Sequence, residues 1–102
     1  MNDDDDFFST KFNSELQKLT QSAGWELSDT GKSLLKIFRF KNFVHAWGWM
    51  TKIAITAEKL NHHPEWSNVY GTVSVKLITH DTNSITRKDI QLANKMDEFY
   101  NP

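Results

Sequence analysis

Three of the four histidines in this 102-residue chain stand where regular structure is expected to break. His62 and His63 precede Pro64, which has no amide hydrogen and disfavours helical geometry in the residue before it. His80 stands at the expected end of a strand. Because imidazole gains and loses a proton near neutral pH, side chains presented at such breaks are candidates for general acid and base catalysis. The alternative is that they are core histidines without chemistry.

Two acidic residues are spaced to act on these histidines. Glu58 precedes His62 by four residues, so on a continuing helix its carboxylate would share that face and could hydrogen-bond the imidazole. A solvated helix residue is the alternative interpretation of Glu58. Asp89 follows Thr86 by three residues, and local sequence therefore favours a capping box at the start of a last helix. His45 has no acidic residue within four positions, and we assign it no role.

The same composition excludes several other chemistries. The chain has no cysteine, which removes thiol nucleophiles, redox motifs and cysteine-bound metals. The histidines and Glu58 could supply metal ligands, but adjacent histidines diverge on an ordered backbone and no HExxH or HxH spacing is present. We therefore predict no metal. No serine lies in a GxSxG elbow, which argues against a serine hydrolase.

Charge and hydropathy limit the partners and the location. The net charge is −1 with no basic cluster, so we expect no direct binding to nucleic acid. The longest uncharged stretch, residues 42–51, is far shorter than the roughly 20 apolar residues of a membrane span. The first residues also lack the features of a secretory signal, and a soluble intracellular protein is expected.

The periodicity predicts elements that would position these side chains. We expect one single-domain α+β two-layer sandwich over residues 9–102, with a four-stranded antiparallel sheet and three helices on one face in the order α-β-β-α-β-β-α. Residues 1–8, with the run of four aspartates, are expected to be a disordered acidic tail. The helices are predicted at 10–23, 43–60 and after Thr86, and the strands at 25–27, 34–41, 66–70 and from residue 72 to the pair Thr79-His80.

The helix over residues 43–60 is more apolar around its circumference than packing against one sheet would require. Its core face is predicted to contain Phe43, Trp47, Met50, Ala54 and Ala57, which leaves Trp49 on the polar side. An aromatic residue there favours a second partner surface, and we expect homo-oligomerisation through this helix. A single surface tryptophan on a monomer is the alternative.

The spacing of the candidate residues resembles the signature of a known family. Glu58, the run His62-His63-Pro64, Tyr70, His80 and Asp89 follow one another at the distances found in the pterin-4a-carbinolamine dehydratases. The resemblance covers roughly residues 25–100 and includes Trp25, the aromatic segment 38–49, the run His63-Pro64-Glu65-Trp66 and the pair Thr79-His80.

The resemblance implies a reaction and a set of roles. Such enzymes remove water from 4a-hydroxytetrahydropterin to give quinonoid dihydropterin, in the recycling of tetrahydrobiopterin. The pterin is the substrate, and no cofactor is implied. By the resemblance His62 and His63 would lie near the 4a-hydroxyl as acids, and His80 would be the base or an orienting residue. Glu58 and Asp89 would orient the imidazoles, and the pterin would contact Trp25, Asn61, Pro64, Trp66 and Thr79.

The family also implies partners. It suggests a homotetramer, a dimer of dimers built through helix 43–60 and the sheet edges. Some members are dimerisation cofactors of a homeodomain transcription factor, so a protein-binding module is the alternative function. A pterin-binding protein without turnover is a third. The resemblance indicates a cytoplasmic location and leaves a nuclear one open.

Overall fold

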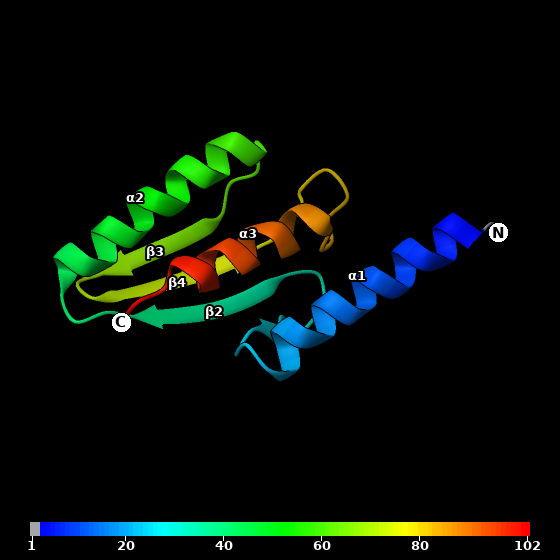
Figure 1. Cartoon of the computed structure of the whole chain (residues 1–102). Coiled ribbons are helices and arrows are strands. Elements are labelled where there is room, and N and C mark those ends of the chain that lie inside the picture. Colours follow the sequence, from blue (N-terminus) through cyan, green and yellow to red (C-terminus); the bar gives the residue numbers. More distant parts are fainter. Residues whose placement is uncertain (1–2) are drawn as a thin grey trace.

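The computed structural model describes residues 3–102 and folds them into three helices and one four-stranded sheet (Figure 1). The strands follow the spatial order β1-β2-β4-β3, and every neighbouring pair is antiparallel. The predicted α+β class and element order are therefore confirmed. The elements are α1 (Asp3–Gln21), β1 (Glu26–Leu27), β2 (Leu34–Arg39), α2 (Phe43–Leu60), β3 (Glu65–Val69), β4 (Thr72–Leu77) and α3 (Arg87–Phe99).

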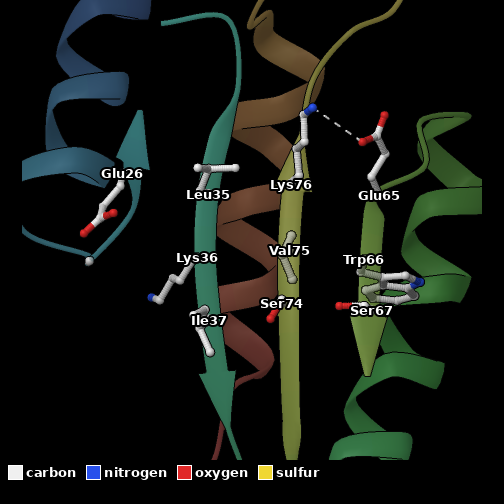
Figure 2. Close-up of a pocket in the computed structure, with 11 residues that line it drawn as sticks. Glu26, Leu35, Lys36, Ile37, Glu65, Trp66, Ser67, Ser74, Val75 and Lys76 are labelled. Carbon is white, nitrogen blue, oxygen red and sulfur yellow. Dashed lines mark ion pairs between the residues drawn. The ribbon is translucent and has the colours of Figure 1, made fainter. Parts of the chain in front are cut away.

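One hydrophobic core lies between the sheet and the helices. Helices α2 and α3 lie next to each other over one face of the sheet, and the last turns of α1 contact α3 and β1 (Figure 1). The strands alternate as half-buried strands should: Val73, Val75 and Leu77 of β4 are buried while the residues between them are exposed. Figure 2 views the sheet from its opposite face, which we call the open face, with α3 behind β2 and β4.

The turn between β3 and β4 depends on a close backbone approach. Val69 pairs with Thr72, so Tyr70 and Gly71 form a two-residue connection, with Tyr70 at a φ of 52°. The Gly71 carbonyl accepts a hydrogen bond from the Phe40 amide at 2.8 Å. A Cβ atom on Gly71 would stand 2.7 Å from the Phe40 carbonyl oxygen, so only glycine fits there.

Replacing Gly71 by alanine should therefore destabilise the protein. The added methyl group must displace the Phe40 carbonyl, and overpacking of this kind costs about 1–3 kcal/mol in the free energy of unfolding. Urea unfolding measures the change. Gly48→Ala is the matched control: a Cβ there meets nothing within 4 Å, and removing glycine from a helix interior stabilises by about 0.5–1 kcal/mol. Equal effects at both sites would contradict the close approach.

The buried face of α2 differs from the predicted one. Trp49 is 4% exposed and Trp47 is 57% exposed, the reverse of the expectation. The indole N–H of Trp49 donates to the Met96 carbonyl of α3 at 3.1 Å, and its ring lies 4.6 Å from that of Phe38. Helix α2 has two apolar stripes, one with Trp47 and one with Trp49. The stripe with Trp49 faces the core, where its indole N–H reaches a buried acceptor. The buried residues are Ala46, Trp49, Met50, Ile53 and Ala57.

Met50 and Ala57 thus lie in the core as predicted, whereas the other three residues of the predicted face do not. Because the stripe with Trp49 faces the core, large apolar side chains on the outer surface of α2 are exposed. We call them the α2 apolar surface, which consists of Phe43, Val44, Trp47 and Ile55.

Helix α1 begins earlier than predicted. It starts at Asp3 rather than at residue 10, and it ends at Gln21 rather than at residue 23. The segment 3–8, expected as a disordered tail, is therefore helical, and residues 1–2 lie outside the described residues. Acidic residue types are favoured in a first helical turn, and no glycine or proline interrupts the segment. None of the helices within residues 3–102 has the length and apolar character needed to span a membrane.

Candidate active site

The end of α2 separates the two adjacent histidines. Asn61 takes up the left-handed conformation (φ 51°, ψ 44°), and its amide donates back to the last turn of the helix. The His62 amide also donates to the Ala57 carbonyl, at 3.0 Å. Pro64 then leads directly into β3. As a result His62 is buried, and His63 is exposed.

His62 is held by a buried carboxylate at the start of α3. Its Nε2–H donates to Asp89 Oδ1 at 2.6 Å. Asp89 is 0% exposed, and its other oxygen accepts from the Thr79 hydroxyl and from the Thr86 amide, each at 2.8 Å. A buried carboxylate is tolerable because donors surround it. The capping interaction expected from Thr86 is present, and the same carboxylate also binds an imidazole.

The second pair joins His63 to Glu58, at 3.0 Å between Nε2 and Oε1. The sequence predicted a bond from Glu58 to His62, and this prediction is wrong. It assumed that the helix continues through residue 62, whereas the left-handed turn at Asn61 directs the second histidine to the carboxylate. Both side chains are exposed, at 56% for His63 and 79% for Glu58.

The third pair joins His80 to Glu65, at 2.8 Å between Nε2 and Oε1. Residue spacing predicts no role for Glu65 beyond its place in the run His63-Pro64-Glu65-Trp66. The strand register of the structure supplies the missing signal, because it places Glu65 opposite Lys76, four residues before His80. The isolated bridge between Thr79 and Ser84 then folds the loop after β4 back on itself.

Bonds connect the histidines of the two distant segments. His62 binds Asp89, Asp89 binds Thr79, and Thr79 is followed directly by His80. His80 in turn binds Glu65, which begins the strand just after His62 and His63. The segments 62–63 and 79–80 are thus linked through Asp89 and through Glu65.

All three imidazoles are bound through the same nitrogen. Each Nε2 faces a carboxylate oxygen, and an ionised carboxylate can only accept. A neutral imidazole in such a pair carries its hydrogen on Nε2, so the lone pair on Nδ1 is the one that can take a proton. The arrangement can therefore donate and accept protons.

The predicted substrate-contact residues are only partly brought together. Asn61 is the exposed cap of α2, Pro64 is half-buried, and the Thr79 hydroxyl donates a hydrogen bond to Asp89. Trp66 is half-buried, with its ring 6.2 Å from that of Trp49, and Figure 2 shows it pointing towards α2.

Trp25 lies apart from the histidines. It is 1% exposed, and its indole N–H donates to Asp97 Oδ2 at 2.9 Å. The other oxygen of Asp97 accepts from Lys36 Nζ at 2.7 Å. Asp97 and Asp89 are eight residues apart on α3, which corresponds to about 12 Å along a helix axis. Trp25 therefore belongs to the packing at the far end of α3.

A hollow of about 560 Å³ lies on the open face of the sheet (Figure 2). Leu35 and Ile37 of β2 line one side of it, and Glu65 and Lys76 lie at one end. Glu65 thus lines the hollow and also binds His80. Among the described side chains, those of residues 10–102, no group of three or more histidine, aspartate or glutamate residues is arranged to hold a metal ion.

Comparisons with known proteins all point to the same family. A family model described as pterin 4 alpha carbinolamine dehydratase matches residues 9–99. A protein of Rhizobium johnstonii is 53% identical over 81 residues, covering 79% of this chain and 80% of that protein. One of Roseobacter denitrificans is 49% identical over 91 residues, covering 89% and 93%. Both bear the name "Putative pterin-4-alpha-carbinolamine dehydratase".

A solved structure is similar as well. The crystal structure of a transcriptional coactivator/pterin dehydratase from Brucella melitensis superposes with a TM-score of 0.79 at 41% sequence identity. The superposition covers 88% of this chain and 93% of that one. The likeness therefore extends over nearly the whole of both chains.

Proposed function

Since this chain belongs to the pterin-4a-carbinolamine dehydratase family, a family of lyases, we propose that it removes water from 4a-hydroxytetrahydropterin by proton transfer through histidines. The observation that supports this most directly is the set of three imidazole–carboxylate pairs, of which the His62 pair is connected to the His80 segment through Asp89 and Thr79. The product is quinonoid dihydropterin, and the pathway served is the recycling of tetrahydrobiopterin.

The chemistry needs an acid and a base but no redox partner. The bond between C4a and the hydroxyl oxygen breaks, the oxygen leaves as water after taking a proton, and N5 loses its proton. Electrons are redistributed within the pterin only, so no cofactor is required. We assign the acids to His62 and His63 and the base to His80. General acid and base assistance of this kind contributes about 10²- to 10⁴-fold in rate.

The proposal is tested by following the absorbance of a freshly generated 4a-hydroxytetrahydropterin. The purified chain should accelerate its loss over buffer alone, and His80→Ala should remove most of that acceleration. A chain that binds the pterin but gives no acceleration would refute the enzyme and leave a pterin-binding protein.

We further propose that the α2 apolar surface builds a homotetramer. Phe43 and Trp47 stack there with ring centroids 5.9 Å apart, and both side chains are about half exposed. Apolar aromatic side chains that cluster on one surface are typical of interfaces. Sheet edges would provide the second contact of a dimer of dimers.

Replacing Trp47 by arginine should therefore dissociate the assembly. Loss of an interface tryptophan commonly costs about 2 kcal/mol or more, which raises the dissociation constant at least about 30-fold. Light scattering after size-exclusion chromatography reports the mass relative to the 11.9 kDa chain. Gln91→Arg introduces the same charge at an exposed position of α3 and should leave the mass unchanged. A wild-type chain that elutes as a monomer would refute the tetramer.

A role as a transcriptional coactivator is the second candidate. It is favoured by the description of the similar Brucella melitensis protein and by the exposed apolar surface of α2, to which a partner could bind. The two functions differ in a measurable way. A coactivator would bind a partner with Trp47 in the contact whether or not the histidines were intact, whereas the enzyme needs the histidines.

A further inference from the structure

Glu65 occupies a position that joins the two histidine segments. It is the first residue of β3, and it follows His63 with only Pro64 between them. Its Oε1 atom lies 2.8 Å from Nε2 of His80, which belongs to the loop after β4. One short stretch of chain thus supplies two histidines and the carboxylate that binds the third.

The sheet fixes where this carboxylate lies. Glu65 is directly opposite Lys76 in the antiparallel register, and Figure 2 shows the two side chains next to each other at the end of their strands. Lys76 Nζ lies 3.8 Å from Glu65 Oε2, so the two oxygens have separate partners, lysine for one and imidazole for the other. The lysine pair holds the carboxylate in place from the sheet side.

We propose that Glu65 is a positioning residue for His80, an assignment that rests on the proposed dehydratase function. The Glu65 carboxylate accepts the Nε2 hydrogen of the neutral ring, which leaves the Nδ1 lone pair to take the proton from the substrate. The side chain of His80 is 72% exposed, so little protein surrounds the ring to orient it. The carboxylate supplies that orientation.

The exposure of this pair makes the proposal testable without loss of the fold. Glu65 is 46% exposed, and pairs in such positions contribute little to stability. Glu65→Gln should therefore unfold at nearly the same urea concentration as the wild type. It should lower kcat about 10- to 100-fold with little change in KM, because it disturbs the orientation of a reacting group and touches no substrate.

The decisive experiment is a double-mutant cycle between positions 65 and 80. If Glu65 acts through His80, Glu65→Gln lowers kcat in the wild-type background and has no further effect in His80→Ala. An equal loss in both backgrounds would overturn the proposal, as would an unchanged kcat in the single variant. Glu26→Gln is the matched control, since this carboxylate lines the same hollow from β1 and should leave kcat unchanged.

A measurement independent of activity separates this proposal from the proposed function. Nitrogen NMR of the neutral His80 ring should show a protonated Nε2 and a bare Nδ1 in the wild type, and signals closer to those of free imidazole in Glu65→Ala. Identical spectra would overturn the assignment of Glu65. A wild-type chain without dehydratase activity would refute the proposed function, and the spectra alone would then decide whether Glu65 orients His80.

Discussion

His63→Ala should lower the turnover of 4a-hydroxytetrahydropterin about 10²- to 10⁴-fold, the range that general acid assistance contributes. Its stability should change little. The imidazole is 56% exposed and is bound only to the exposed Glu58, and such surface pairs contribute about 0–1 kcal/mol to the free energy of unfolding. The two effects are measured by the absorbance assay and by urea unfolding of the same preparation.

His45→Ala is the control for this prediction. His45 is also an exposed histidine, but it lies in the first turn of α2, and its ring contacts Asn42 at the opposite end of the helix from the site. It should keep wild-type turnover. Full activity in His63→Ala would remove this residue from the mechanism, and unfolding of the variant would show that the ring has a structural role that its exposure does not indicate.

Asp89→Asn should lower both stability and turnover. The carboxylate accepts from three donors, His62, Thr79 and Thr86, in a fully buried position. An amide has one acceptor oxygen, so its NH₂ group must face donors. Each buried donor left without a partner costs about 1–3 kcal/mol, and we expect a loss of about 2–5 kcal/mol in the free energy of unfolding. Turnover falls as well, since His62 is no longer oriented.

Asp97→Asn is the control that separates the loss of stability from the loss of turnover. Asp97 lies on the same helix and binds Trp25 and Lys36, so its amide variant should also be less stable. It lies about two helical turns from Asp89, and its turnover at low temperature should match that of the wild type. If both variants lose activity in proportion to their stability, the role of Asp89 in the site would be contradicted.

The sequence predicted most of the fold because its periodic signals were strong. Helix α2 has the predicted bounds, since Asn42 caps its start and Pro64 prevents it from continuing. The sheet and its hairpins follow from Gly31, Gly71 and alternating strands. The inner face of α2 was not predictable, because two tryptophans two positions apart lie on different stripes. The contacts that distinguish them lie on other elements: the Met96 carbonyl accepts from the Trp49 indole, and Phe38 and Phe40 pack against its ring.

In the site, too, features that follow from local spacing were predicted, and features that depend on tertiary contacts were missed. Spacing and resemblance predicted the contact of Asp89 with an imidazole, which the structure contains, but not the carboxylate partners of His63 and His80. Helical spacing assigned Glu58 to the wrong neighbour, because the left-handed turn at Asn61 is a tertiary choice that spacing does not reveal. Glu65 became visible only with the strand register.

The left-handed turn at Asn61 also means that the two adjacent histidines are not spare copies of each other. The His62 ring is buried against Asp89 of α3, and the His63 ring is exposed to solvent beside Glu58 of α2. A protein that lost either one could not substitute its neighbour without rebuilding the helix end. The two adjacent histidines of the sequence therefore encode two separate parts of the site.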